Sequence, residues 1–290
     1  MYILSLDIGG TTFCTGLFTK NLECVYISKN DKIRNYDSLS DIEEAINAQI
    51  NNILEHNHLN IYDIIGMGIA CPGPLDSSKG KILNTPNLKF FQNYNICDVF
   101  KKKLNIDVKV DNDANLFTLG EWFSNYKQHK IFIGITIGTG LGFGAIINDT
   151  LYQGAHGMAL EYGCSPFKWG KCEENISIRY FHQETKKVYG KILSPRIVEK
   201  LFFEGNKEAM AIYNKFGESL GITISHIINI FDPNIIILGG GLSKAFDCFS
   251  GDMYKAIKKH SLSFSNHPID IRQTRTMTQS ILLGAAMQFN

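Results

Sequence analysis

Three glycine-rich segments, each directly after a run of strand-type apolar residues, constrain the fold of this 290-residue chain most strongly. Glycine lets backbone N–H groups approach a phosphate closely and threonine hydroxyls add donors, so such loops can bind a polyanion without many lysines. A single glycine turn between strands is usually only a turn. Three such segments in one chain, with Asp111-Asn112-Asp113-Ala114-Asn115 between the first and the second, together predict a nucleotide-binding site. The three segments are Asp7-Ile8-Gly9-Gly10-Thr11-Thr12, Thr136-Ile137-Gly138-Thr139-Gly140-Leu141-Gly142 and Leu238-Gly239-Gly240-Gly241.

The apolar pattern predicts strands that alternate with helices. Short apolar runs at residues 2–7 and 13–18 predict a β-hairpin whose tip holds the first glycine segment. Further strands are expected at 64–71, 108–111, 131–137, 142–147, 150–152 and 235–238, and helices at 38–55, from Asp113 onward, at 208–230 and at 279–288. A strand hairpin, a helix and a strand therefore occur twice, which predicts two similar α/β lobes with a cleft between them and a boundary near residue 115.

Composition and charge narrow the class of protein. A formal net charge of +1 gives no electrostatic reason to expect nucleic acid as a partner. No apolar stretch approaches the roughly 20 residues that a membrane span needs, and Met1 leads directly into a predicted strand, so we expect no membrane association and a cytoplasmic location. Seven cysteines without framework spacing are expected to stay reduced, and Cys71 is interpreted as a buried thiol rather than a nucleophile.

Two aspartates have positions suited to phosphoryl transfer. Asp113 follows a strand and opens a helix, which would project its side chain from the carboxyl end of a sheet, where α/β folds place their ligands. The alternative is an ordinary helix N-cap. Asp7 ends the first strand, where a carboxylate could hold Mg²⁺ through water because this ion keeps most of its hydration shell. The alternative for Asp7 is a turn-capping role.

The order of motifs resembles the ROK family of sugar kinases and sugar-responsive repressors, within the actin-like ATPase superfamily. Beyond the glycine segments, the resemblance rests on motifs spread over nearly the whole chain: Cys71-Pro72-Gly73-Pro74, Thr85-Pro86-Asn87-Leu88, Asp111-Asn112-Asp113-Ala114-Asn115, Gly154-Ala155-His156-Gly157, Glu161-Tyr162-Gly163 and Phe231-Asp232-Pro233-Asn234. It implies a two-lobed actin-like ATPase (ribonuclease H-like) fold with a central interlobe cleft. Residues 1–115, with a C-terminal helix at about 275–290, would form a small α/β lobe, and residues 116–274 a large one.

The resemblance also implies roles for individual residues. Asp113 would be the catalytic base that takes the proton of a sugar hydroxyl. Thr11, Thr12, Gly138, Thr139 and Gly140 would surround the phosphates of ATP, together with Gly9 and Gly10, while Gly239, Gly240 and Gly241 would lie beside the adenosine. The substrate-binding positions are Gly73, Asn87, Asn112, Glu161, Cys164 and Glu173. A site of this kind rejects analogues that lack a bonded hydroxyl.

One part of the chain departs from the family pattern. Zinc-containing members have a histidine where this chain has Cys164, followed by a cysteine cluster that here shrinks to Lys168-Trp169-Gly170-Lys171-Cys172-Glu173. Two cysteines do not complete a tetrahedral site, which normally takes four protein ligands, so no structural zinc is expected. A residual site of Cys164, Cys172 and a distant His156 or His182 stays open as an alternative.

The residues and the resemblance together thus predict a kinase that uses ATP and Mg²⁺ to phosphorylate a hexose of the glucose or allose type. The expected position of phosphorylation is the hydroxyl group on C6. Mannose, fructose and N-acetylated amino sugars are rival acceptors, and a homodimer is common in the family. A non-catalytic sugar-binding sensor or pseudokinase is the alternative function. A DNA-binding repressor is disfavoured because we expect no helix-turn-helix ahead of Tyr2.

Overall fold

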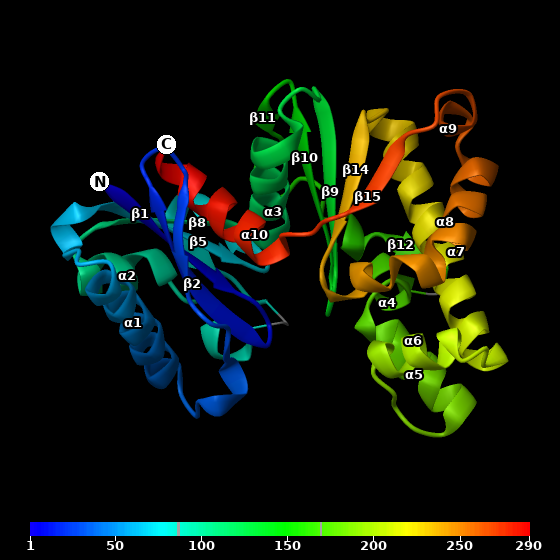
Figure 1. Ribbon diagram of the computed structural model, residues 1–290, viewed down its shortest axis with the longest axis horizontal. Helices are drawn as coiled ribbons and strands as arrows, with labels where there is room; N and C mark the ends of the chain where they lie inside the picture. The colour runs from blue at the N-terminus through cyan, green and yellow to red at the C-terminus, as the bar shows by residue number, and fades with distance from the viewer. Residues whose placement is uncertain (86–87, 169) are drawn as a thin grey trace. The chain divides into compact units, whose positions relative to one another are not determined.

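The computed structural model describes residues 1–85, 88–168 and 170–290, and its chain divides into two compact units (Figure 1). The first unit comprises Met1–Tyr126, Leu151–Ala159 and Thr276–Asn290. The second comprises Lys127–Thr150 and Leu160–Arg275. The first change of unit therefore falls at residue 126, later than the expected boundary near residue 115. No helix within the described ranges is long and apolar enough to span a membrane.

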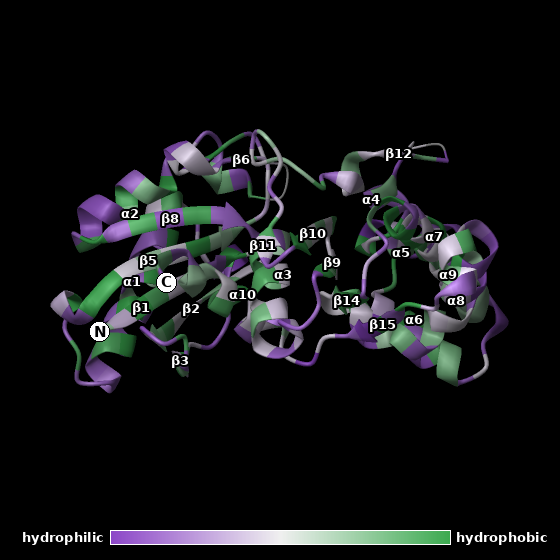
Figure 2. Cartoon of the chain, turned by 90° about the horizontal axis from the view of Figure 1, so that it is seen from above, coloured by the Kyte–Doolittle hydropathy of each residue, from purple (hydrophilic) through white to green (hydrophobic). Residues whose placement is uncertain are grey.

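A six-stranded mixed sheet forms the centre of the first unit. Its strands run in the order β3-β2-β1-β5-β8, with β4 also paired to β2. The strands β1 and β2 form the predicted antiparallel hairpin, whereas β1, β5 and β8 are parallel neighbours. Strand β8 alternates hydrophilic and hydrophobic residues (Figure 2). The bounds are β1 Tyr2–Ile8, β2 Thr12–Thr19, β3 Cys24–Ile27, β4 Asp31–Lys32, β5 Ile64–Cys71 and β8 Asp107–Asn112.

Local sequence signals account for the helices of this unit. Helix α1, Leu39–His56, begins after Ser38, whose side chain and that of Asp41 form a capping box. Its apolar face is buried at Ile42, Ile46, Ile50 and Ile53, and the helix predicted at 38–55 is confirmed. Helix α2, Ile96–Leu104, ends at Asn105 in the left-handed conformation. A small pair of strands, β6 Leu75–Asp76 and β7 Lys81–Ile82, lies between β5 and α2 in the chain.

Close packing of two helices explains why the change of unit falls after residue 115. Helix α3, Asp113–Glu121, packs against α10, Met277–Ala286, which the chain reaches only at its end. A Cβ atom on Gly284 would lie 1.9 Å from the carbonyl oxygen of Leu116, and one on Gly120 would lie 1.9 Å from that of Ser280. Because both positions lack a side chain, the two helices approach closely, and α3 lies with the first unit in full.

The second unit contains a five-stranded sheet in the order β11-β10-β9-β14-β15. The strands expected at 131–137, 142–147 and 150–152 are present and pair in chain order as a meander, and β14 pairs in parallel with β9. Its strands are β9 Ile131–Ile137, β10 Leu141–Ile147, β11 Thr150–Leu151, β14 Ile235–Gly239 and β15 Asp270–Gln273, with the separate pair β12 Pro166–Phe167 and β13 Gly170–Lys171. Its helices are α4 Cys172–Asn175, α5 Ile178–Tyr189, α6 Pro195–Phe203, α7 Lys207–Phe231, α8 Phe246–His260 and α9 Leu262–Asn266.

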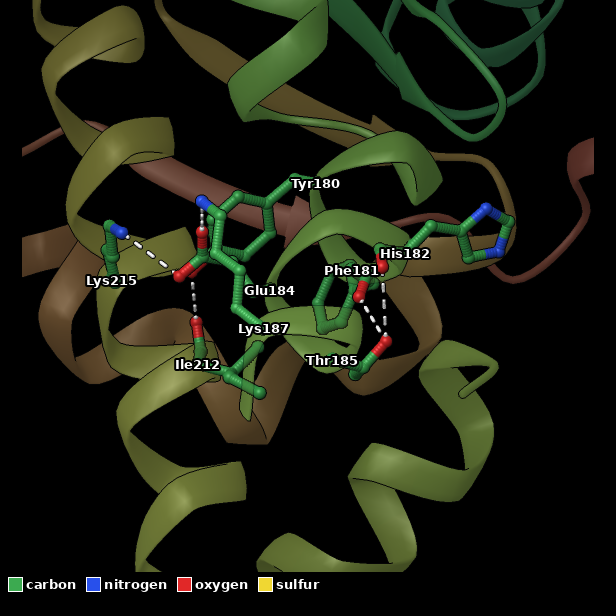
Figure 3. Close-up of polar contacts among 8 residues, drawn as sticks. All are labelled: Tyr180, Phe181, His182, Glu184, Thr185, Lys187, Ile212 and Lys215. Atoms are coloured by element: carbon green, nitrogen blue, oxygen red, sulfur yellow. Dashed lines mark hydrogen bonds and ion pairs between the residues drawn. The ribbon is translucent and has the colours of Figure 1, made fainter. Parts of the chain in front are cut away.

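Polar contacts join α5 to α7 at the edge of the second unit's core (Figure 3). Tyr180 is buried and donates its hydroxyl hydrogen to the carbonyl oxygen of Ile212 at 2.8 Å. Glu184 accepts hydrogen bonds from Lys187 at 2.7 Å and from Lys215 of α7 at 3.1 Å. These bonds satisfy polar groups that would otherwise lose their water where the helices pack.

Candidate active site

The carboxyl ends of three parallel strands place the predicted acidic residues at one edge of the first unit's sheet (Figure 1). Asp7 of β1 is in register with Ala70 of β5, which is in register with Asp111 of β8. Neighbouring strands lie about 4.8 Å apart, so the backbones of Asp7 and Asp111 are about 10 Å apart, with the end of β5 between them. The sheet therefore brings together residues that are distant in sequence.

Asn112 and Asp113 occupy the start of α3. The Oδ1 atom of Asn112 accepts hydrogen bonds from the backbone N–H groups of Ala114 at 2.8 Å and Asn115 at 3.3 Å, which makes Asn112 the N-cap. Asp113 is the first helical residue, and its Oδ1 also accepts from Ala114 N–H at 2.8 Å. The N-cap role considered for Asp113 thus belongs to Asn112.

Burial changes the proton affinity of both carboxylates. Burial raises the pKa of Asp113, and the hydrogen bond from the Ala114 N–H group opposes that rise. For Asp7, burial and then the negative charge of Asp113 raise the pKa to about 7. The two carboxylates are therefore close enough to influence each other, and each holds a proton more firmly than an exposed aspartate.

Cys71, at the end of β5, lies among these acids and is buried. Burial and the charges of Asp113, Cys97, Asp111 and Asp7, in that order of size, raise its pKa well above the ordinary value. A cysteine acts as a nucleophile through its thiolate, so this environment keeps Cys71 an unreactive thiol. The prediction of a buried thiol is confirmed.

The first glycine segment continues from Asp7 as a tight turn between β1 and β2. The Gly9 N–H group donates to the carbonyl oxygen of Thr12 at 2.8 Å, which closes the turn. The carbonyl oxygen of Thr11 accepts from the Ile33 N–H group at 2.9 Å. Gly10 and Thr11 are exposed, and Thr12 is half-buried. The segment thus presents backbone and hydroxyl groups next to the Asp7 carboxylate.

The other two glycine segments lie side by side in the second unit. Thr136 of β9 is in register with Gly239 of β14, so the two strands end at the same edge of the sheet. Gly240 has a φ of 87°, and a Cβ atom there would lie 2.3 Å from the carbonyl oxygen of Ile137. Only glycine fits both conditions without strain. The third segment therefore contacts the strand end from which Gly138, Thr139 and Gly140 follow.

The turn that carries Glu161 and Cys164 packs beside the second glycine segment. A Cβ atom on Gly163 would lie 2.2 Å from the carbonyl oxygen of Leu141, the residue after Gly140. Cys164 is exposed, and its pKa is raised by partial burial and then by the charges of Glu173 and Glu161. These three predicted substrate-binding residues therefore lie near one another in the second unit.

Glu173 already has a partner within the protein. Its Oε1 atom lies 3.2 Å from Nη1 of Arg179, and this ion pair joins α4 to the first turn of α5. The next residue back in α5, Ile178, donates its N–H group to the carbonyl oxygen of Gly138 at 2.9 Å. Arg179 thus orients Glu173 on the part of α5 that supports the second glycine segment.

The predicted site residues fall into two groups, one in each unit. The first unit holds Asp7, Gly9, Gly10, Thr11, Thr12, Gly73, Asn112 and Asp113, and the second holds Gly138, Thr139, Gly140, Glu161, Cys164, Glu173, Gly239, Gly240 and Gly241. Asn87 lies outside the described residues.

The acidic pair has the chemistry to hold a hydrated magnesium ion. Burial and then the charge of Asp113 raise the pKa of Asp7, and a cation bound there would offset the repulsion between the two carboxylates. Mg²⁺ often takes one or two carboxylates and keeps several waters, so this donor set fits it. Within the ranges that the structure describes, no three histidine, cysteine or acidic side chains are grouped as metal ligands.

Two polar residues near the site were not selected from the sequence. Asp111 is 7% exposed, and its Oδ2 atom accepts a 2.6 Å hydrogen bond from Nε2 of Gln153. The signal for Asp111 was the pair of aspartates around Asn112 at the end of a strand. Gln153 carried no signal, because it comes from an irregular segment 42 residues further along the chain.

The chain is similar to known proteins over nearly its whole length. A sequence model described as "ROK family" matches residues 3–290. An N-acetyl-D-glucosamine kinase of Haemophilus influenzae is 29% identical over 306 residues, which cover 98% of each chain. A glucokinase of Thermotoga maritima is 27% identical over 310 residues, covering 98% of this chain and 96% of that protein.

A solved structure shows the fold. The ROK family glucokinase of Streptomyces griseus, in complex with glucose and AMPPNP, superposes with a TM-score of 0.83 at 22% identity and 99% coverage of both chains. The two-lobed actin-like ATPase fold expected from the sequence is confirmed.

Proposed function

This chain belongs to the ROK family, and on that premise we propose that it transfers the γ-phosphoryl group of ATP to a hydroxyl group of a hexose. The observation that carries the proposal is the position of Asp113. It is the first residue of α3, at the end of a parallel strand, with a pKa raised by burial and with the capping role taken by Asn112. A carboxylate in such a place can act as a base on a bound hydroxyl group.

Asp113 takes the proton of the acceptor hydroxyl as the oxygen of that hydroxyl bonds to the γ-phosphorus. The bond between this phosphorus and the oxygen that bridges it to the β-phosphate breaks, and ADP leaves with the bonding electrons. A raised pKa helps this step, because a base is most effective when its pKa approaches the working pH. Asn112 has its Oδ1 engaged in the helix cap, so its amide Nδ2 has a fixed direction and serves as a donor to the sugar.

The glycine segments and Asp7 hold ATP in this account. Backbone N–H groups and hydroxyls of Thr11, Thr12 and Thr139 bond the phosphates, and the open backbone at Gly241 leaves room for the adenosine. Asp7 would hold Mg²⁺ through water, and the ion would neutralise charge that develops on the phosphates. The raised pKa of Asp7 means that a cation competes with a proton for this carboxylate near neutral pH.

The acceptor is a hexose of the glucose or allose type or an N-acetylated amino sugar related to glucose, with C6 as the phosphorylated position. The two named relatives act on N-acetyl-D-glucosamine and on glucose, so the acceptor class extends from the expected glucose and allose to the N-acetylated sugar. A primary hydroxyl such as the one on C6 is the least hindered nucleophile on these rings. Glu161 and Glu173 supply acceptors for further hydroxyls, with Cys164 between them in the chain.

The test is ADP release by the purified protein with Mg²⁺ and ATP against glucose, allose, mannose, fructose, N-acetylglucosamine and N-acetylmannosamine. Phosphorus-coupled NMR of the product identifies the oxygen that was phosphorylated. Turnover selective for glucose, allose or N-acetylglucosamine, with the phosphate on C6, supports the proposal. Sugar-induced thermal stabilisation with no ADP released would instead establish the alternative, a non-catalytic sugar sensor.

A further inference from the structure

The segment Leu151–Ala159 belongs to the first unit, although the residues on both sides of it belong to the second. Its residues 154–158 are exposed, and Gly154 and Gly157 both have a φ of 71°. The segment is closed at its base, where the Ala159 N–H group donates to the carbonyl oxygen of Gln153 at 3.1 Å. The same residue, Gln153, joins the segment to β8 through its side chain.

Asp111 receives that side chain. Nε2 of Gln153 donates to its Oδ2 atom at 2.6 Å. The Oδ1 atom accepts from the Asn112 N–H group at 2.7 Å and from Nδ2 of Asn115 at 3.4 Å. Burial raises the pKa of Asp111, while these three hydrogen bonds favour its ionised form. A buried carboxylate is costly without partners, so it holds all three donors in place.

These contacts connect the segment to the residues that carry the proposed chemistry. Asn112 follows Asp111 directly, caps α3 and precedes Asp113. Asn115 lies one turn into the same helix, and its own N–H group bonds the Oδ1 of Asn112. A displacement of Gln153 therefore acts on Asn112 and Asp113 through one shared carboxylate.

We propose that Asp111, acting through Gln153, is a positioning residue of the acceptor site, fixing the segment 153–159 relative to Asn112 and Asp113. This inference rests on the proposed function, since it assigns the pair a role in presenting the sugar hydroxyl to the base. An error of about 1 Å in such a geometry can lower a rate by up to about 100-fold. The pair contacts the start of α3, where the acceptor hydroxyl is proposed to meet its base, so we expect its effect on the sugar rather than on ATP.

The experiment reverses the polarity of the bond. Gln153→Glu places a carboxylate against Asp111 and removes the donor. The double variant Asp111→Asn with Gln153→Glu restores a donor and an acceptor, now in the opposite order. The control is Gln49→Glu, which adds the same charge to a half-buried glutamine of α1 whose Oε1 accepts from Ser28 at 2.8 Å and keeps that bond as a carboxylate. Steady-state kinetics and hydrogen exchange of residues 153–159 are measured for all four proteins.

We expect Gln153→Glu to lower kcat/KM for the sugar by about 10-fold or more, with the KM for ATP changed by less than about twofold. Hydrogen exchange in residues 153–159 should be faster in this variant than in the wild type. The double variant should recover the wild-type kcat/KM for the sugar and the wild-type exchange rate, and Gln49→Glu should match the wild type in both. Any of three results overturns the inference. These are an unchanged kcat/KM for the sugar in Gln153→Glu, a rise in the KM for ATP as large as the loss in sugar kcat/KM, and a double variant no more active than the single one.

Absence of wild-type turnover would refute the proposed function by itself. In that case hydrogen exchange of residues 153–159 alone tests whether the Gln153–Asp111 bond holds the segment. Equal exchange rates in wild type and Gln153→Glu overturn this role, and faster rates in the variant support it.

Discussion

Asp7 and Asp113 are electrostatically coupled across the end of β5: burial and then the charge of Asp113 raise the pKa of Asp7 to about 7. Strand β1, which carries Asp7, and strand β8, which ends at the residue before Asp113, are each neighbours of β5 and not of each other. Between about pH 4 and pH 7, where an exposed aspartate would be ionised, the Asp7 carboxyl therefore tends to hold a proton or to bind a cation. The arrangement suits a site that binds Mg²⁺ with ATP and needs a base of raised pKa beside it.

Replacing Asp7 by Asn should stabilise the protein in Mg²⁺-free buffer above pH 7 while removing turnover. The pKa of Asp7 is raised from 3.8 to about 7 in the folded state, so its protonated form favours folding. That stability is present below pH 3.8 and is lost as the pH rises toward 7. Thermal unfolding from pH 4 to 8 checks this: the Tm difference between variant and wild type should grow with pH.

An exposed aspartate of the same unit provides the comparison for that series. Asp37→Asn should leave both the Tm and its pH dependence close to those of the wild type. A gap in Tm between Asp7→Asn and wild type that stays constant from pH 4 to 8 would contradict the raised pKa of Asp7.

Gly240→Ala should destabilise the second unit and weaken ATP binding. The new Cβ would lie 2.3 Å from the carbonyl oxygen of Ile137, at a φ of 87°. Overpacking of this kind costs about 1 to 3 kcal/mol. Differential scanning calorimetry gives the loss of stability, and titration with a non-hydrolysable ATP analogue gives the change in Kd.

Gly251→Ala is the matched control for that substitution. Gly251 lies in α8, is exposed, and a Cβ there meets nothing within 4 Å. Alanine favours a helix over glycine by about 1 kcal/mol, so this variant should be as stable as the wild type or more so. Equal Tm values for Gly240→Ala and Gly251→Ala would refute the close approach at Gly240.

Glu184→Gln should reduce stability at neutral pH and make little difference in acid. Burial alone would raise the pKa of Glu184, but hydrogen bonds and charges from Lys187 and Lys215 lower it below 4.5 (Figure 3). A lowered pKa gives stability that is present above pH 4.5 and is lost as the pH falls through the folded-state value. After solvent screening the contribution is about 0.5 to 1 kcal/mol.

Urea unfolding at pH 7 and pH 3 measures this difference. The free energy of unfolding of Glu184→Gln should lie below that of the wild type at pH 7, and the two should converge at pH 3. A difference that persists unchanged at pH 3 would show that the ion pairs are not its source.

The periodicity of apolar residues was sufficient to predict most of the regular structure. The strand predicted at 64–71 has those bounds, and the helix predicted at 38–55 begins after Ser38, whose hydroxyl caps it. These elements are encoded locally, by alternation and by a capping residue. Each glycine segment begins where a predicted strand ends, so the position of the segment could be predicted from the strand.

Contacts between distant residues were not predictable in the same way. The packing of α3 on α10 depends on Gly120 and Gly284, and no local pattern relates a glycine in one helix to a carbonyl of another. The segment Leu151–Ala159 has no apolar periodicity, so its place in the first unit and the bond between Gln153 and Asp111 emerged only in three dimensions. The N-cap role of Asn112, by contrast, could have been predicted, since Asn is a favoured capping residue directly before a helix.

The most direct test of this account is the turnover of Asp113→Asn with Mg²⁺, ATP and the preferred sugar. Asparagine preserves the size of the side chain but cannot accept the proton, so kcat should fall by about 100- to 10,000-fold while ATP binding stays near that of the wild type. Such a result would establish Asp113 as the base. Turnover at the wild-type rate would contradict the central claim.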